Sequence, residues 1–247
     1  MPLPTVPEQR RIAAVLDRAD ALRATRAKTV AKLDRLIEAT FVHSFGSPLA
    51  NPRDFDIEPL IHLVDPGRPI TYGILKPGPD QTAGVPYVRV VDMIDGSVEA
   101  AVLKRTTREI STQYRRSLLV EGDLLLSIRG HVGRLAMIEA DVAGANITQD
   151  TARLAVREAD PVYVLECLRM PELQRWMAAF TKGAAVKGIN LTDVKRLPIP
   201  RPPIDEQQRF AAVVRRARAE RKACQTSARG LTTLFESLQQ QAFRGEL

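Results

Sequence analysis

The chain has 247 residues, with 36 Lys and Arg against 29 Asp and Glu, a formal net charge of +7 and an isoelectric point near 9.7. This length suffices for one large domain, or for a compact domain with an added module, without disulfides or metals to support the core. Cys167 and Cys224 lie far apart without CxxC spacing, and His43, His62 and His131 are scattered. The sequence therefore predicts neither a disulfide framework nor a metal site.

The charge and the distribution of apolar residues also bear on location and partners. The N-terminus lacks the pattern of a signal peptide, and no run approaches the roughly 18 apolar residues that a membrane span needs. We therefore expect a cytoplasmic protein without a membrane partner. The positive charge favours a polyanion, with nucleic acid ahead of a membrane surface.

Residues 1–46 are predicted to form a proline-rich lead-in and one long helix. The segment "PTVPEQRRIAAVL" begins at Pro4, and its acidic residue falls in the first helical turn, where the helix dipole favours it. Apolar residues then recur three and four apart, with Arg26 interrupting the series: Ile12, Val15, Ala19, Leu22, Val30, Leu33, Ile37 and Phe41. This spacing is typical of a coiled-coil seam.

Residues 47–200 are predicted to form a mixed α/β domain. The segments "GVPYVRVVDM", "GDLLLSIRG", "VGRLAMIE" and "TARLAVRE" indicate strands, with turns at Asp95-Gly96 and Glu121-Gly122. The segment from Pro161 to Thr181 has helical spacing. We assign its large side chains to the core rather than to an aromatic binding surface: Tyr163, Leu165, Leu168, Leu173, Trp176, Met177 and Phe180.

Signatures of catalysis are missing from this domain. The sequence contains no GxxxxGK[ST], GxGxxG, HExxH or GxSxG motif. "NPR" at Asn51 falls short of an amino-methyltransferase motif and indicates a turn. "DVK" at Asp193 is half of a nuclease site without the acidic strand that should precede it. A stand-alone nuclease or methyltransferase is therefore the weaker alternative.

Five cations of the middle domain stand beside glycines or at predicted strand ends: Arg89, Arg129, Arg134, Lys182 and Lys187. Small neighbours allow a phosphate backbone or a base edge to approach closely. Each one alone is more often a solvated charge, but several in one basic protein predict a nucleic-acid interface.

Residues 201–247 repeat the first segment. "PPIDEQQRFAAVV" from Pro202 matches the opening phrase, and the register holds without a gap at an offset of 198 residues, from Glu8 and Glu206 to Phe45 and Phe243. The apolar series continues through Phe210, Val213, Ala217, Cys224, Ala228, Leu231, Phe235, Leu238 and Ala242. We interpret the ends as a duplicated helical module, whose two copies pack on each other or on a partner's copies.

In this order, these segments resemble the specificity (S) subunits of type I restriction-modification systems. The proline-rich junctions "PLPTVPEQRRIA" and "PIPRPPIDEQQRFA" are similar to the family's entry into its long helices. "ITYGI" at Ile70, "GVPYVRVVDM", "GDLLLSIRGHVGR" and "KGINLTDVKRLPIP" are similar to the recurrent blocks of its target recognition domains. The resemblance covers essentially the whole chain.

The resemblance implies an α+β fold in which one target recognition domain (47–200) lies between two long helices (1–46 and 201–247) that form an antiparallel coiled coil. It implies a non-catalytic subunit that reads one half of a split double-stranded DNA target and docks methyltransferase subunits through its helices. No cofactor is expected in this chain; S-adenosylmethionine would bind the methyltransferase. Further partners are a restriction or translocase subunit, and a second copy of the chain or a separate half-subunit.

The resemblance also assigns residues. Tyr72, with the five cations above, would contact DNA, and Glu8, Gln9, Glu206 and Gln207 would contact the partner subunit. The chain resembles the rear half of a full subunit, with no recognition domain before Met1. A natural half-subunit that dimerises, a split-gene product and an inactive remnant all fit, as does a coiled-coil adaptor that binds only protein.

Overall fold

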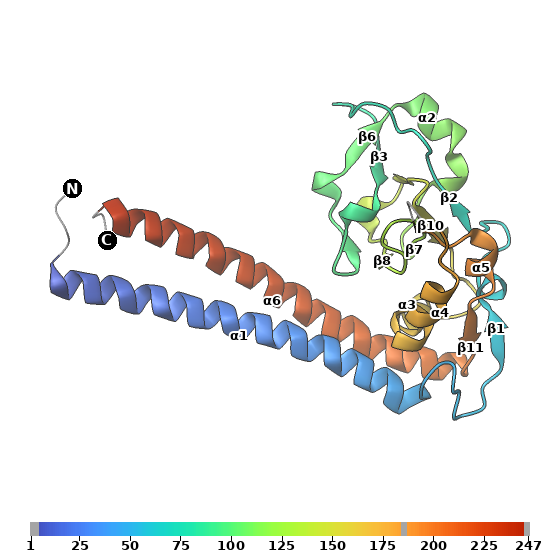
Figure 1. The fold of residues 1–247 in the computed structure, drawn as a ribbon, viewed down its shortest axis with the longest axis horizontal. Coiled ribbons are helices and arrows are strands. Elements are labelled where there is room, and N and C mark those ends of the chain that lie inside the picture. The colour runs from blue at the N-terminus through green and yellow to red at the C-terminus, as the bar shows by residue number, and fades with distance from the viewer. Residues whose placement is uncertain (1–4, 184–186, 245–247) are drawn as a thin grey trace. The chain divides into compact units, whose positions relative to one another are not determined.

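The computed structural model in Figure 1 describes residues 5–183 and 187–244. The chain divides into a helical unit, Met1–Thr40 with Ala212–Leu247, and a sheet unit, Phe41–Ala211. Two long helices, α1 (Val6–Phe45) and α6 (Ile204–Arg244), each contribute residues to both units. Among the described residues, no helix is long and apolar enough to cross a membrane.

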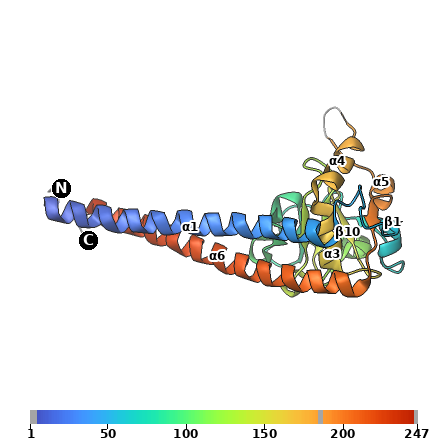
Figure 2. The ribbon, with the colours of Figure 1, turned by 90° about the horizontal axis from the view of Figure 1, so that it is seen from below.

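In the helical unit, α1 and α6 run side by side in opposite directions (Figures 1 and 2). Arg221 Nε lies 2.9 Å from Asp34 Oδ1, and the guanidinium of Arg23 lies 5.2 Å from the ring centroid of Phe235. Moving from Asp34 back to Arg23 on α1 thus moves the contact forward from Arg221 to Phe235 on α6, as an antiparallel pair requires. The predicted antiparallel coiled coil is confirmed.

The seam of this coiled coil differs from the predicted one at several positions. Val214 is fully buried whereas Val213 is 49 % exposed, and on α1 the side chains of Val15 and Leu22 are exposed too. The seam passes instead through Leu16, Arg23, Val214 and Arg221, which are buried or partly buried. Arginine can bury its aliphatic stem while its charged head stays hydrated or paired, so a search for apolar residues alone misplaced the seam.

The described residues of the sheet unit form eleven short strands in four sheets. A four-stranded antiparallel sheet has the order β2 (Thr71–Tyr72), β10 (Thr151–Leu154), β7 (Leu124–Ser127), β8 (Leu135–Met137). A three-stranded sheet has the order β6 (Lys104–Thr106), β3 (Val85–Val88), β9 (Asn146–Ile147), with β3 and β9 parallel. Two antiparallel pairs complete the set: β4 (Met93–Ile94) with β5 (Ser97–Val98), and β1 (Ile57–Pro59) with β11 (Pro198–Pro200).

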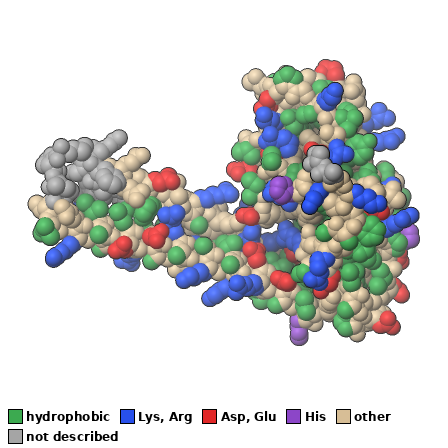
Figure 3. All heavy atoms as spheres, viewed as in Figure 1, with side chains coloured by type: hydrophobic (Ala, Val, Ile, Leu, Met, Phe, Trp, Pro, Cys, Tyr) green, Lys and Arg blue, Asp and Glu red, His purple; other side chains and the backbone are tan. Residues whose placement is uncertain are grey.

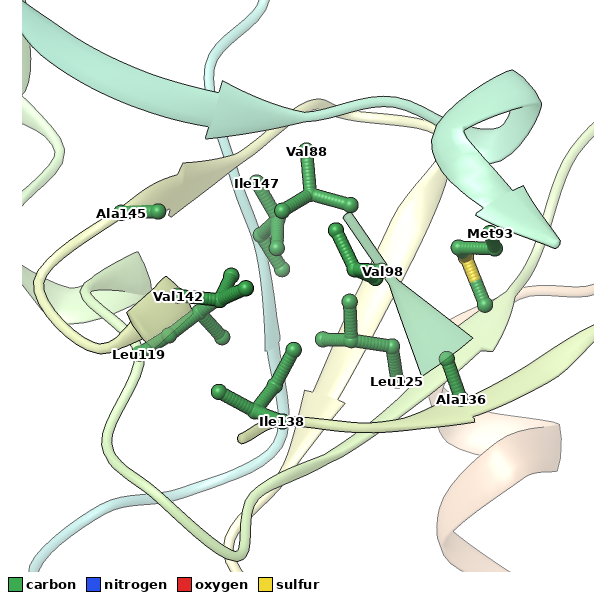
Figure 4. Packing of buried hydrophobic residues seen from close by; sticks show 10 residues of the cluster. All are labelled: Val88, Met93, Val98, Leu119, Leu125, Ala136, Ile138, Val142, Ala145 and Ile147. Carbon is green, nitrogen blue, oxygen red and sulfur yellow. The ribbon is translucent and has the colours of Figure 1, made fainter. Parts of the chain in front are cut away.

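One apolar cluster joins the strands of the sheet unit (Figure 4). Its members come mainly from β3, β4, β5, β7, β8 and β9 and the loops between them: Val88, Met93, Val98, Leu119, Leu125, Ala136, Ile138, Val142, Ala145 and Ile147. Strands this short are held by the packing of such side chains more than by ladder hydrogen bonds. The cluster therefore fixes the positions of the strand ends.

The predicted strands are present but shorter than the apolar runs that indicated them. "GVPYVRVVDM" contains β3, a 3-10 turn and β4 rather than a single strand. The turn at Asp95-Gly96 is confirmed, because both residues have positive φ and connect β4 to β5. The 3-10 turn between β3 and β4 is Val90–Asp92, and further 3-10 turns cover Leu60–Leu63, Ala100–Val102, Arg115–Ser117 and Ala140–Val142.

The helical segment predicted from Pro161 to Thr181 is two helices, α3 (Pro161–Arg169) and α4 (Pro171–Ala179). Pro171 causes the break, because proline disfavours helical geometry in the preceding residue and suits the first turn of a new helix. The other short helices are α2 (Arg108–Gln113) and α5 (Leu191–Lys195). Among the large side chains assigned to the core, Phe180 is 39 % exposed, so the assignment of Phe180 to the core was wrong.

An aromatic cluster anchors the ends of the long helices within the sheet unit. Phe41 and Phe45 of α1 pack against Tyr163 of α3 and against Phe210 of α6, with ring centroids 5.0 to 5.7 Å apart. The Tyr163 hydroxyl donates to the Pro200 carbonyl at 2.8 Å. Both junctions of the repeat thus converge on α3.

Candidate nucleic-acid interface

Tyr72, Arg129 and Arg134 all lie at one end of the four-stranded sheet. β2 and β7 end there and β10 and β8 begin there, since every pair of neighbouring strands is antiparallel. Tyr72 is the last residue of β2, Arg129 follows β7, and Arg134 precedes β8. At about 4.8 Å between strands, this edge is about 14 Å wide, comparable with the ~12 Å width of a DNA major groove. We call this edge the reading end.

Gly73 fixes the position of Tyr72. A Cβ on Gly73 would lie 1.8 Å from the Ile147 carbonyl oxygen, so only glycine fits there. The Gly73 N–H donates to the Thr148 carbonyl at 3.2 Å, which holds β2 against the neighbouring segment. The Tyr72 side chain is 46 % exposed, and its ring is therefore available for contact.

Backbone hydrogen bonds bring Lys182 and Lys187 to Arg129. The Gly130 N–H donates to the Lys187 carbonyl at 2.8 Å, and Lys182 and Gly188 exchange two hydrogen bonds of 2.8 and 2.9 Å. Arg129 and Gly188 form a β-bridge. Residues far apart in the sequence are thus joined at the reading end, and all three cationic side chains are exposed.

The β7–β8 turn that carries Arg129 and Arg134 is organised by buried Ser127. Its hydroxyl donates to the His131 carbonyl and accepts the Arg134 N–H at 2.7 Å. Gly130 and Gly133 supply the positive φ angles, 73° and 95°. The turn therefore presents its charged side chains on a hydrogen-bonded frame.

The reading end has an excess of cations. Arg129 approaches Asp150 at 3.8 Å and donates to Gln149 Oε1 at 3.4 Å. Among the described residues, no carboxylate pairs with Arg134, Lys182 or Lys187. On the face seen in Figure 3, Lys and Arg side chains are spread over the sheet unit.

At the opposite end of the same sheet, the cations are neutralised. Arg68 makes two hydrogen bonds of 2.7 Å to the buried Asp123, and Arg157 lies 3.7 Å from Asp65. Burial lowers the pKa of Arg153, which lies between these pairs in β10. The two ends therefore differ in character, since Arg68 and Arg157 lie beside carboxylates at this end, whereas Arg134, Lys182 and Lys187 pair with none among the described residues at the reading end.

Arg89 stands apart from the other predicted cations. Its Nε and Nη2 donate to Asp92 at 2.9 and 2.7 Å, and its backbone N–H donates to Asp92 Oδ2 at 2.8 Å. The hydrogen bond to Asp92 raises the pKa of Arg89. Arg134 Nη1 lies 3.4 Å from the carbonyl of Val90 in the same turn. Arg89 thus shapes the turn beside the reading end, and a DNA contact by its guanidinium stays a prediction.

The four residues predicted to contact a partner occupy unequal environments. Glu8 and Gln9 are exposed, with Glu8 accepting from the Thr5 hydroxyl at 3.3 Å. Glu206 pairs with Arg53 at 2.6 Å. Gln207 is buried, accepts the Asp160 N–H at 2.9 Å and donates to the Pro202 carbonyl at 2.8 Å. The same two residues of the repeat therefore stabilise the fold in the second copy and are exposed to solvent in the first.

Sequence analysis missed three groups beside the reading end. Gln149 accepts a hydrogen bond from Arg129, His131 follows Arg129 by two residues in the same turn, and both are at least partly exposed. Trp176 of α4 and Phe180, the residue that follows this helix, stack with centroids 4.1 Å apart, just before Lys182. The polar pair Gln149-Asp150 directly before an alternating strand was a usable signal. The aromatic pair offered none, because its spacing equals that of a core face.

The described residues offer little for catalysis. No group of three or more His, Cys, Asp or Glu residues within ranges 5–183 and 187–244 is arranged to hold a metal ion. Burial raises the pKa of the Cys167 thiol, which keeps it protonated and unreactive. Asp193 is held in the first turn of α5 by Asn190, at 2.6 and 2.8 Å. The arrangement suits binding of an anionic polymer.

Comparison with known proteins relates this geometry to a family. A family model described as "Type I restriction modification DNA specificity domain" matches residues 76–219, more than half of the chain. The range includes all five cations of the predicted interface and begins just after Tyr72. The type I restriction enzyme EcoBI specificity subunit of Escherichia coli is 31% identical over 202 residues, which are 79% of this chain and 42% of that protein. The chain thus spans less than half the length of this relative.

Solved structures share the fold. The HsdS subunit from Thermoanaerobacter tengcongensis aligns with a TM-score of 0.57 at 24% identity, over 100% of this chain and 61% of that one. The S subunit of a type I restriction-modification system from M. genitalium aligns with a TM-score of 0.63 at 13% identity, over 96% and 61%. The predicted α+β architecture agrees with both.

Proposed function

Because the chain belongs to the family of type I restriction-modification DNA specificity subunits, we propose that its sheet unit reads one half of a split DNA target through the reading end. The observation that carries this is the convergence of Tyr72, Arg129, Arg134, Lys182 and Lys187 at one edge of one sheet. These residues come from three separate segments of the sequence, and packing alone gives no reason for exposed cations to gather there.

The chemistry of the reading end supports base and backbone contacts together. Arginine can donate two parallel hydrogen bonds to a guanine edge, whereas lysines bind phosphates as point charges. Arg129 and Arg134 belong to a turn braced by Ser127, which suits direct readout. The backbones of Lys182 and Lys187 are hydrogen-bonded to Gly188 and Gly130, which suits phosphate positioning by their side chains.

The paired helices have the second part of the proposed role. They dock methyltransferase subunits and set the distance between two recognition units, the second of which comes from another copy or a separate half-subunit. The repeated sequence supports this, because equivalent helices present equivalent surfaces to two equal partners. The chain itself performs neither methyl transfer nor strand cleavage, and S-adenosylmethionine binds the partner.

The test uses the chain co-purified with its methyltransferase subunit and DNA carrying the target found by mapping methylated bases. Arg129→Ala and Arg134→Ala should each weaken target binding by about 1 to 3 kcal/mol and relax specificity at one base pair. The matched control is Arg157→Ala, an exposed arginine at the opposite end of the same sheet. Equal losses for all three variants would remove the reading end from DNA recognition. Binding that does not vary with salt would remove the DNA role altogether.

A further inference from the structure

The net charge of the chain belongs entirely to the helical unit. Residues 1–40 and 212–247 contain 15 Lys and Arg against 8 Asp and Glu, whereas residues 41–211 contain 21 of each. The sheet unit is thus neutral overall, although it carries the reading end. The excess of +7 needs an explanation from the helices.

On α1, charges of opposite sign occupy different faces. Relative to the seam residues Ala19, Val30 and Ile37, the acidic residues that follow the first turn of α1 lie on one flank: Asp17, Asp20, Asp34 and Glu38. Asp34 pairs with Arg221 of α6 and Asp20 with Arg23. A row of cations lies on the outward side: Arg11, Arg18, Lys28, Lys32 and Arg35, here called the α1 cation row. The acidic flank therefore neutralises arginines of the helix pair and leaves the row uncompensated.

The α1 cation row is exposed along its whole length. All five residues are exposed, and within the described part of the chain none of them forms an ion pair. From Arg11 to Arg35 the row extends over 24 residues, or about 36 Å at 1.5 Å per residue. One turn of B-DNA is about 34 to 36 Å long, so the row matches the length of one helical turn of duplex.

The repeat separates two parts of this row. Arg11 and Arg18 have arginines at the equivalent positions of the second copy, Arg209 and Arg216. Lys28, Lys32 and Arg35 instead correspond to neutral residues: Thr226, Gly230 and Thr233. Those positions of α6 are also exposed, so packing does not explain the difference. A pair of equal protein partners would need the same surface on both helices, and three cations on one helix alone point to a ligand that is not duplicated.

We propose that Lys28, Lys32 and Arg35 bind phosphates of the DNA backbone and add sequence-independent affinity to the complex. The proposal rests on the proposed DNA-reading function. DNA is a single polymer shared by the whole assembly, which accounts for a row on one helix only. Evenly charged phosphates also tolerate a row of flexible side chains, whereas a protein surface would need complementary carboxylates at fixed positions.

The experiment measures how DNA binding by the methyltransferase complex depends on salt. The triple variant Lys28→Gln, Lys32→Gln, Arg35→Gln should flatten the log-log slope by roughly 0.9 for each phosphate that is no longer neutralised, or about 2 to 3 in total. Target and non-target DNA should lose affinity by the same factor, so the ratio between them should not change. The control variant Arg10→Gln, Arg26→Gln, Arg229→Gln removes the same charge from exposed positions outside the row and should leave the slope near the wild-type value.

Three other outcomes each overturn the proposal. An unchanged slope in the row variant, with specific binding by the wild type intact, would show that the row does not touch DNA. Equal flattening in both triple variants would reduce the effect to general net charge. Loss of the methyltransferase subunit from the row variant, with DNA binding retained, would make the row a protein-docking surface. Failure of the wild type to bind any DNA would instead contradict the proposed function itself.

Discussion

Gln207 provides a direct test of how the repeat is used, since its counterpart Gln9 also follows a glutamate but lies in a different environment. Gln207 accepts the Asp160 N–H and donates to the Pro202 carbonyl, with both bonds buried. Asp160 in turn caps α3 by accepting the Val162 N–H at 2.8 Å. Gln207→Ala would therefore leave two buried backbone groups without partners beside a helix cap.

The expected cost is large for one substitution. Each buried polar group left without a partner costs about 1 to 3 kcal/mol, so the loss of two partners should lower the free energy of unfolding of the sheet unit by about 2 to 6 kcal/mol. Gln9→Ala, at an exposed position, should change it by less than about 0.5 kcal/mol.

Denaturant unfolding followed by tryptophan fluorescence measures this difference. Trp176 is the single tryptophan and belongs to the sheet unit, so its signal reports on that unit. A drop of less than about 1 kcal/mol for Gln207→Ala, or equal drops for both variants, would refute the structural role assigned to Gln207. The Gln9 variant then tests partner contact without a change in stability, by co-purification with the methyltransferase subunit.

Two further substitutions test the site frame and the seam. Gly73→Ala places a Cβ 1.8 Å from the Ile147 carbonyl oxygen, so β2 must shift and Tyr72 must move with it. We expect the sheet unit to lose about 1 to 3 kcal/mol of its free energy of unfolding and the DNA affinity to fall. Unchanged melting and unchanged DNA binding would contradict the close fit assigned to Gly73. Val214→Asp buries a carboxylate in the seam, so it should lower the stability of the helix pair by several kcal/mol and abolish co-purification with the methyltransferase subunit. Val213→Asp, at a half-exposed neighbouring position, should change neither the stability nor the co-purification. Similar melting curves by circular dichroism for the two variants would contradict the assigned seam.

The helical half of the fold could be predicted from the sequence because heptad spacing and the repeat are local signals. The seam itself was harder to assign. Val213 and Val214 are adjacent and equally apolar, and the correct choice depends on Arg221, which an apolar pattern omits. A comparison of the two copies would have helped, because Arg23 and Arg221 are equivalent and both contact the opposite helix.

The site was predictable as a set of residue types but not as a place. Cations beside glycines were visible in the sequence, yet their convergence depends on strand register and on hydrogen bonds such as Gly130 to Lys187, which join distant parts of the chain. The role of Arg89 was more accessible, since Asp92 follows three residues later. That of Gln207 was not, because its partner Asp160 is 47 residues away.

The division of charge between the units has a consequence for how such a subunit would recognise its target. Nonspecific attraction to DNA grows with the number of phosphates neutralised, and a strongly basic reading surface would hold any sequence tightly. A neutral sheet unit limits that attraction, so discrimination depends on the few placed side chains of the reading end. If the α1 cation row binds DNA phosphates, affinity for DNA in general and preference for one sequence become separable properties. Substitutions in the α1 cation row would then change how long the complex stays on DNA, and substitutions at Arg129 or Arg134 would change where.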